Sequence, residues 1–388
     1  MTARKTERIH SLDALRAIMM LLGIILHVAL TYNITDHGSE WYLKDPNSTH
    51  LFSDFLVLLI HYFRMPVFFF IAGFFGALLF YEKTPQQMLK NRFRRVLLPF
   101  IVFLFLLWPC IIFSFEYTSV AFSQQGKPLM AGLEKFNHLQ DFLPRRTGHL
   151  WFLYYLSYIS LFAFVLALLM QKTPTLTRLI KQVFCWVIAR PLIRITCFSL
   201  LICAILVAFQ TSMVEVSLSL APELKTFTYF LYFYLMGWLL YVSRINLDIL
   251  LQYAWLCTSL AIVLVTLQGL YVQWLEIPAS NDHFAFMFVN SIIISLFIFG
   301  LTGLFIRYCS KYSFYMRYIS DASYWVYLVH FPLTVLIPAF IWKFPLPAFG
   351  KFSLVVLITS IICFASYHYL VRNSVVGQFL NGRRYPQN

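Results

Sequence analysis

Long runs of apolar residues, separated by shorter polar or proline-rich segments, recur along the whole chain. Most contain about 18 or more residues, enough at about 1.5 Å per residue to cross the roughly 30 Å hydrocarbon core of a bilayer. They are continuously apolar and too long for the ~10-residue alternating strands of a membrane barrel. The pattern therefore predicts an all-α, polytopic transmembrane helical bundle that forms a single domain over residues 1–388. The ten expected spans are Leu12–Tyr32, Leu51–Tyr81, Val96–Phe115, Leu150–Met170, Leu192–Phe209, Phe227–Tyr241, Ile249–Val272, Phe284–Ile306, Ala322–Ile341 and Phe352–Val371.

Composition agrees with this pattern. The chain is 60% hydrophobic and 12% charged with a mean hydropathy of +0.72, against roughly 45–50% and about 25% in soluble proteins. These values exclude a soluble globular enzyme. The net charge of +14 would suggest nucleic acid as the partner of a soluble protein, but membrane topology explains it better. The seven cysteines lie in or beside apolar segments without C-x-x-C pairs, so we expect no disulfide framework and no metal site.

The basic residues are distributed unevenly between alternate loops. With the N-terminus in the cytoplasm, the cytoplasmic side holds 21 of the 30 Lys and Arg residues with five acidic residues, and the opposite side holds eight basic and eleven acidic residues. The positive-inside rule thus predicts an even number of spans with both termini in the cytoplasm. Asp13 and Arg16 interrupt the first apolar stretch and no A-x-A site follows, so we expect a retained membrane helix and no cleaved signal peptide.

The second span is unusually long. Its 31 residues would extend about 46 Å as a straight helix, so it must tilt, kink or protrude from the bilayer. Pro66, Gly73 and Gly76 offer a means to kink it.

Ionisable residues inside spans are costly and mark candidate functional positions. Arg16 and His27 are eleven residues apart on the first span, which places them on one helix face about 16 Å apart along the axis. Further basic residues are expected at the level of Arg16, because Arg92, Arg94 and Arg95 directly precede the third span. Arginines in such a cluster can hold phosphate groups. The alternatives are topology determination for the arginines and a packing role for His27.

Two further spans carry candidates near mid-depth. His61 and Arg64 stand three residues apart on the second span, after Asp54, where Arg64 either binds a ligand or ties helices together through backbone carbonyls. His330 lies nine residues into the ninth span, before Pro332, and is either a ligand-binding or a hydrogen-bonded packing residue.

His149 begins the fourth span beside Trp151, at the outer surface. The histidine is either an acid or base, with the tryptophan as a platform for a sugar ring, or part of an interfacial aromatic belt.

These residues occur in motifs that resemble the acyltransferase-3 family of integral membrane O-acyltransferases. The motifs run from one end of the chain to the other, and their order and spacing together carry the resemblance. They are Leu12-Asp13-Ala14-Leu15-Arg16-Ala17, Arg16-x10-His27, His61-Tyr62-Phe63-Arg64-Met65-Pro66, Ala72-Gly73-Phe74-Phe75, Arg92-Phe93-Arg94, His149-Leu150-Trp151-Phe152-Leu153 and Ser323-Tyr324-Trp325-Val326-Tyr327-Leu328-Val329-His330.

The resemblance implies a multi-pass enzyme of the bacterial inner membrane. It takes an acyl group from a cytoplasmic acyl-CoA, expected to be succinyl-CoA, which is a substrate and not a permanently bound cofactor. The acceptor is a carbohydrate hydroxyl on the outer face, and a periplasmic glucan is expected because the resemblance is strongest to members that succinylate such glucans. His27, Arg16, Arg92 and Arg94 match the family's histidine and arginine positions. Ala72 stands where the family usually has serine, which excludes a serine nucleophile there, and no fused outer hydrolase-like domain is expected.

Together these observations predict a mechanism. Donor phosphates rest on Arg16, Arg92, Arg94 and Arg95, and His27 acts as general base on the acceptor hydroxyl, or forms an acyl-histidine intermediate. A further histidine, His149 or His61, stabilises the oxyanion. Arg64 pairs with the free carboxylate if the acyl group is succinyl, whereas acetyl needs no such partner.

Two other classes of protein remain open. A transporter or flippase of a glycan or lipid-linked sugar would also use buried His and Arg on kinked helices, but the sequence lacks the two-fold repetition of broken helices that such proteins show. A structural scaffold leaves the mid-depth Arg64 without a reason. No pattern in the sequence predicts the oligomeric state.

Overall fold

The computed structural model describes residues 9–274 and 284–382, and every regular element in these ranges is helical apart from one isolated bridge between His37 and Trp41. Nine of the helices are long and apolar enough to cross a membrane. The prediction of an all-α bundle of membrane-spanning helices is thus confirmed. The chain forms two compact units, Met1–Met19 with His61–Val96 and Trp151–Arg317, and Met20–Ile60 with Leu97–Leu150 and Tyr318–Asn388.

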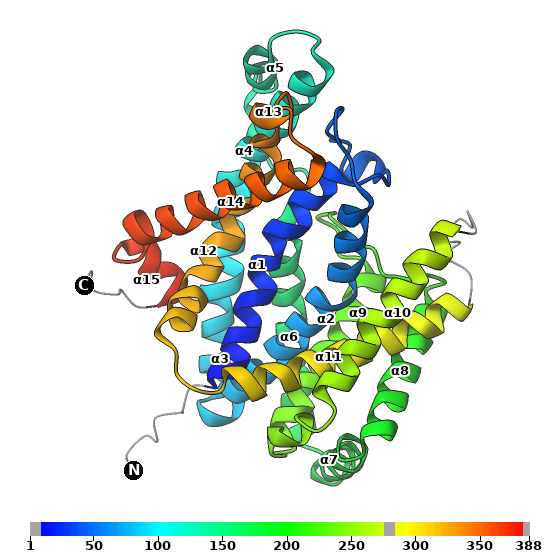
Figure 1. Cartoon of the computed structure of the whole chain (residues 1–388). Coiled ribbons are helices and arrows are strands. Elements are labelled where there is room, and N and C mark those ends of the chain that lie inside the picture. Colours follow the sequence, from blue (N-terminus) through cyan, green and yellow to red (C-terminus); the bar gives the residue numbers. More distant parts are fainter. Residues whose placement is uncertain (1–8, 275–283, 383–388) are drawn as a thin grey trace. The chain divides into compact units, whose positions relative to one another are not determined.

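The first unit contains the N-terminal part of α1 and the C-terminal part of α2, together with the helices of the middle of the chain (Figure 1). Its elements are α1 (His10–Tyr32), α2 (Leu51–Glu82), α3 (Pro85–Arg92), the π-helical η2 (Phe93–Leu97), α6 (Trp151–Gln171), α7 (Pro174–Ile188), α8 (Pro191–Ala208), α9 (Leu224–Val242), the 3₁₀ turn η5 (Leu247–Leu250), α10 (Ala254–Trp274) and α11 (Phe284–Cys309).

The second unit contains the remaining parts of α1 and α2 and the helices of the C-terminal region. Its other elements are η1 (Gly38–Glu40), α4 (Leu98–Ser123), α5 (Pro128–Glu134), η3 (Leu139–Phe142), η4 (Gly148–Leu150), α12 (Phe314–Leu336), α13 (Pro338–Ile341), α14 (Ala348–Ser366), the π-helical η6 (Tyr367–Val371) and α15 (Val375–Asn381). Here α4 continues eight residues beyond the predicted end of its span at Phe115.

Each predicted span corresponds to a helix, but one of these helices is not among the nine. The predicted span Phe227–Tyr241 forms α9, in which Tyr229, Tyr232 and Tyr234 are buried. Tyrosine is much less hydrophobic than leucine or phenylalanine, which explains why α9 is less apolar than the other spans.

Two glycines, Gly73 of α2 and Gly237 of α9, allow these helices to pack closely. A side chain on Gly73 would overlap the carbonyl oxygen of Tyr234, and one on Gly237 would overlap that of Phe70. The backbones of α2 and α9 therefore meet where both helices have glycine. We expected Gly73 to help kink α2; the structure shows that it is needed for this contact.

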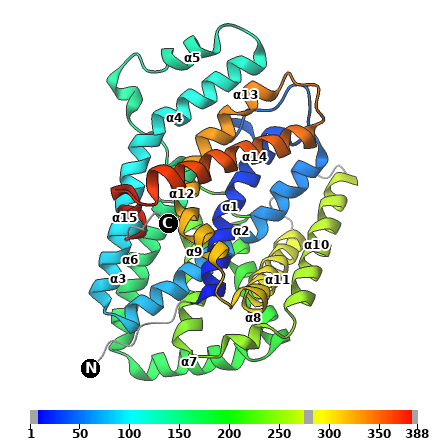
Figure 2. The ribbon, with the colours of Figure 1, turned by 60° about the vertical axis from the view of Figure 1, so that its left-hand side comes forward.

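One predicted loop contains a helix. α7 lies in the segment between the fourth and fifth spans and runs across the direction of α6 (Figure 2). Its exposed apolar residues follow helical spacing, and its other face buries Phe184 and Ile188. Those exposed residues are Leu176, Leu179, Val183 and Trp186.

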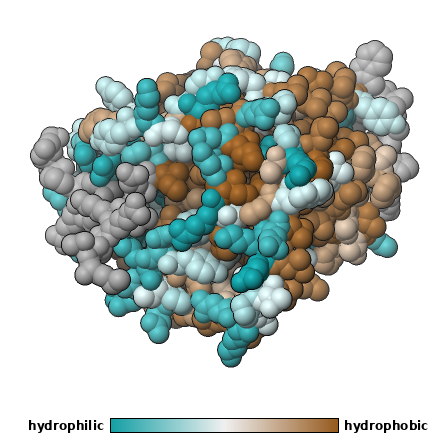
Figure 3. Space-filling model, turned by 90° about the horizontal axis from the view of Figure 1, so that it is seen from below, coloured by the Kyte–Doolittle hydropathy of each residue, from teal (hydrophilic) through white to brown (hydrophobic). Residues whose placement is uncertain are grey.

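Apolar side chains also cover much of the molecular surface elsewhere. The face seen in Figure 3 carries broad hydrophobic areas beside hydrophilic ones. Broad exposed apolar areas of this kind are expected where a protein contacts lipid.

Candidate active site

Three histidines lie together in the second unit. His27 comes from α1, His149 from η4 and His330 from α12. The ring centroids of His27 and His330 are 5.4 Å apart, and those of His149 and His330 are 5.6 Å apart. His330 is fully buried and His149 nearly so, whereas His27 is half-buried. His27 is therefore the most accessible of the three imidazoles.

Backbone carbonyls fix the proton positions of two of these rings. His149 Nε2 lies 2.9 Å from the carbonyl oxygen of Leu328, and His330 Nδ1 lies 2.7 Å from that of Tyr327. A carbonyl oxygen only accepts hydrogen bonds, so both ring nitrogens must carry protons and donate. In the neutral rings the lone pairs then belong to Nδ1 of His149 and Nε2 of His330. The cluster thus combines oriented imidazoles that can bind a proton.

Aromatic rings surround the cluster. Phe331 stacks on His149 and meets His27 edge-on, with centroid distances of 4.7 Å in both cases. Trp41 lies nearly parallel to His27 at 5.8 Å and contacts Phe115 at 5.4 Å. In the described part of the chain no group of three His, Cys, Asp or Glu side chains is placed to hold a metal ion. The arrangement suits proton transfer in a largely apolar environment.

The loop that carries Trp41 is anchored by a buried ion pair. Asp45 accepts a charge-assisted hydrogen bond at 3.2 Å from Lys351 of α14, and the two side chains are 0% and 1% exposed. Asp45 also accepts from the backbone amides of Asn47 and Ser48. These contacts fix the loop between α1 and α2, and with it the position of Trp41.

A histidine of the same loop is held neutral. His37 pairs through its backbone with Trp41, and its ring contacts the Asn33 side chain. Burial lowers the pKa of His37 below its ordinary value of 6.5, which outweighs the opposing effect of Asp54. This imidazole is therefore predominantly neutral at pH 7.

The predicted phosphate-binding arginines lie in the first unit. The guanidinium of Arg16 is 5.5 Å above the ring of Phe75, and Arg92 donates a 2.9 Å hydrogen bond to the carbonyl of Ala72. Both arginines thus contact the same turn of α2. Arg16 also forms a 3.2 Å ion pair with Asp13 and stays partly exposed.

Arg94 and Arg95 follow on the π-helical segment η2, and both are exposed. A single π-helical turn within a helical segment occurs frequently at functional sites. Arg92 Nε is buried, and no residue in the described ranges accepts a hydrogen bond from it. The segment therefore carries two exposed cations, Arg94 and Arg95, beside Arg92, which is hydrogen-bonded to α2.

The remaining predicted residues have different environments. Arg64 is 7% exposed and donates from Nε to the carbonyl oxygen of Met19 at 2.9 Å, the helix-tying contact that we considered as an alternative. His61, three residues earlier, is exposed. Trp151 is half-buried and packs on Phe230 at 5.3 Å. Of the two candidate oxyanion partners, His149 is thus the one that the structure places in the cluster with His27.

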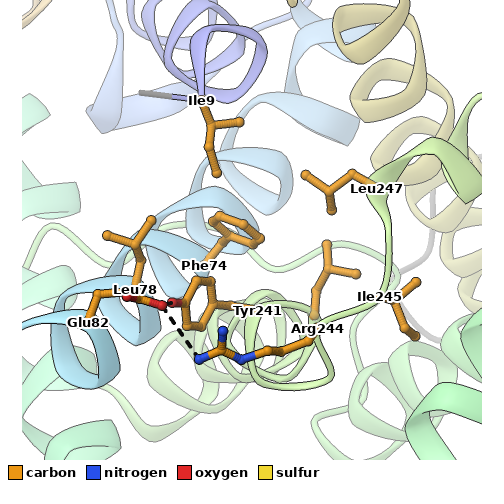
Figure 4. Close-up of a pocket in the computed structure, with 9 residues that line it drawn as sticks. Ile9, Phe74, Leu78, Glu82, Tyr241, Arg244, Ile245 and Leu247 are labelled. Carbon is orange, nitrogen blue, oxygen red and sulfur yellow. Dashed lines mark hydrogen bonds and ion pairs between the residues drawn. The ribbon is translucent and has the colours of Figure 1, made fainter. Parts of the chain in front are cut away.

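A cavity of about 270 Å³ opens in the first unit, lined by Ile9 and by residues of α2, α9 and the segment after α9. Figure 4 shows Tyr241 and Arg244 converging on Glu82 at its edge. The Tyr241 hydroxyl donates to this carboxylate at 2.6 Å, and the Arg244 guanidinium lies 3.5 Å from it. The charges at the edge pair with one another, so this cavity offers no uncompensated cation for a phosphate. None of the predicted site residues lines it.

Sequence reasoning did not place Trp41 beside His27 and did not identify Asp45 or Lys351. Trp41 lies in a polar loop, whose path no periodicity reveals. A signal for the ion pair did exist, because Lys351 stands beside the apolar run of the last predicted span.

The chain is similar to a known protein family and to named bacterial proteins. The family model Acyl_transf_3, described as an acyltransferase domain, matches residues 9–368. Glucans biosynthesis protein C of Salmonella typhimurium (strain LT2) is 34% identical over 158 residues, which are 39% of this chain and 37% of that protein. Proteins of the same name from Salmonella typhi and Salmonella schwarzengrund match to the same extent. The match thus spans less than two-fifths of these relatives, and no solved structure matches the chain.

Proposed function

Because the chain belongs to the acyltransferase-3 family, and is thus a multi-pass membrane O-acyltransferase, we propose that it transfers a succinyl group from cytoplasmic succinyl-CoA to a hydroxyl of a periplasmic glucan. The observation that carries the proposal is the cluster of His27, His149 and His330, which supplies a half-buried base among aromatic rings. The name of the Salmonella relatives supports a glucan as acceptor. The proposed location is the bacterial inner membrane, with both termini in the cytoplasm.

In the proposed reaction His27 is the general base. It takes the proton of the acceptor hydroxyl while the oxygen attacks the thioester carbonyl carbon. The tetrahedral intermediate then re-forms its carbonyl group, the carbon–sulfur bond breaks, and the CoA thiolate takes the proton from His27. The products are a glucan ester and free CoA, so no further reactant is required.

The arginines of the first unit are the proposed donor site. Arg94 and Arg95 are exposed and can bind phosphate oxygens, and Arg16 and Arg92 contact the same turn of α2. Helix α1 is continuous through Arg16 and His27, so eleven residues of helix correspond to about 16 Å between the two levels. Donor and acceptor then need not enter the same compartment.

The choice of succinyl depends on Arg64. This arginine is buried in the second span, and a guanidinium can hold the free carboxylate of a succinyl group through charge-assisted hydrogen bonds. Incubation of the purified protein with radiolabelled succinyl-CoA or acetyl-CoA and a glucan tests the function. Label on the glucan from succinyl-CoA is expected. Label from acetyl-CoA alone would contradict the choice of acyl group, and no label from either donor would contradict the proposed reaction.

A further inference from the structure

Trp41 lies beside the proposed base and is not among the predicted site residues. Its ring is nearly parallel to that of His27, at an interplanar angle of 19° and a centroid distance of 5.8 Å. Its side chain is 5% exposed, and no residue of the described ranges accepts a hydrogen bond from Nε1. An indole N–H can only donate, so it requires an acceptor from elsewhere.

Other polar atoms in this stretch of chain share that property. The hydroxyls of Thr31, Tyr32 and Ser48 are also buried without a hydrogen-bond partner among the described residues. Buried polar groups are nearly always hydrogen-bonded in native proteins. Of these atoms, Trp41 Nε1 is the one that belongs to a ring lying against His27.

The position of Trp41 is fixed independently of any ligand. The backbone of Asp45 donates to the carbonyl of Thr31 at 2.9 Å, and its carboxylate pairs with Lys351. The ring itself packs on Phe115 and Phe331. The indole is therefore held in place beside His27, as preorganised catalytic donors are.

We propose that Trp41 is a catalytic residue whose indole N–H donates to the carbonyl oxygen of the acyl group and stabilises the oxyanion. This inference rests on the proposed acyl transfer. The acceptor hydroxyl is the less suitable partner, because a hydrogen bond donated to the attacking oxygen would weaken it as a nucleophile. As the acceptor oxygen attacks, the π electron pair of the carbonyl group moves onto the carbonyl oxygen. The Trp41 N–H then donates a hydrogen bond to this negatively charged oxygen. The electron pair re-forms the carbonyl group when the carbon–sulfur bond breaks.

Trp41→Phe tests this role, since it keeps an aromatic ring and removes the N–H. The matched control is Trp108→Phe, because Trp108 is a buried tryptophan of the same unit whose Nε1 donates to the carbonyl of Asp141. Only variants whose thermal midpoint equals that of the wild-type protein are used. Two reactions are measured: transfer of label from succinyl-CoA to glucan, and release of free thiol from succinyl-CoA in the absence of glucan.

Trp41→Phe should lower kcat of both reactions by roughly 10²- to 10³-fold, as loss of an oxyanion donor does, with little change in either KM. Trp108→Phe should keep the wild-type kcat. A wild-type kcat in Trp41→Phe, or a change confined to the KM for glucan, would overturn the oxyanion role. If wild-type protein releases thiol but never labels glucan, the proposed acceptor fails while the thiol assay still decides the role of Trp41. If wild-type protein does neither, both proposals fail.

Discussion

Asp45 and Lys351 form a buried ion pair across 306 residues of sequence. Lys351 Nζ also donates to the carbonyl oxygen of Trp342 at 2.5 Å, and the Asn47 side chain donates to the same oxygen. Each charge is thus compensated by its partner and by hydrogen bonds. The pair connects the loop that carries Trp41 to α14 and, through the Trp342 carbonyl, to the segment before it, and so supports the aromatic wall beside His27.

Lys351→Met should destabilise the protein, because it leaves the Asp45 carboxylate buried without its counter-charge. Breaking a buried pair in this way costs about 3–5 kcal/mol, which should appear as a lowered thermal midpoint in detergent. Replacing both residues, as Asp45→Leu with Lys351→Met, should recover much of the loss since no charge then remains unpaired. The matched control is Lys83→Met at an exposed position. Equal midpoints for Lys351→Met and Lys83→Met would contradict the proposed anchoring role.

Arg94→Ala should raise the KM for the acyl donor with little effect on kcat or on stability, because the side chain is exposed on η2. Arg92→Ala should raise the KM and also lower the thermal midpoint, because Arg92 donates to the carbonyl of Ala72. Steady-state kinetics with varied succinyl-CoA, together with thermal unfolding, separate the two effects. Unchanged donor KM in both variants would remove the phosphate-binding role.

Arg64→Met should reduce succinyl transfer by a few orders of magnitude, and acetyl transfer less. The expected loss follows from about 3–5 kcal/mol for removing one partner of a buried charged pair. Arg64 also donates to the carbonyl of Met19, so both donors must be compared within the same folded variant. Equal loss of the two activities would show that Arg64 serves only to hold α1 against α2.

The topology is testable by cysteine labelling. Lys172→Cys, just before α7, should react with a membrane-impermeant maleimide only from the cytoplasmic side, and Gln125→Cys, just after α4, only from the outside. Both positions are exposed, and the wild-type protein gives the background from its own cysteines. Labelling of Lys172→Cys from outside would invert the topology and with it the proposed sidedness of the donor.

The helices were predictable from sequence because apolar runs of sufficient length leave few alternatives in a membrane. The spacing of Arg16 and His27 was likewise readable, since a helix fixes it. The partners of His27 were harder to predict, because Trp41 reaches it from a loop and His330 from a helix about three hundred residues away. The packing role of Gly73 was not predictable, because a sequence does not reveal which helix packs against a glycine. Neither the π-helical turn of Arg94 nor the pairing of Asp45 with Lys351 has a periodic signature.

The central claim, that His27 is the base for acyl transfer, is tested most directly by the rate at which label moves from succinyl-CoA to glucan in His27→Ala. The matched control is His138→Ala, a histidine exposed in the loop before η3. We expect His27→Ala to lose about 10²- to 10⁴-fold in kcat while keeping the wild-type thermal midpoint, and His138→Ala to keep wild-type turnover. Wild-type turnover in a folded His27→Ala protein would contradict the account.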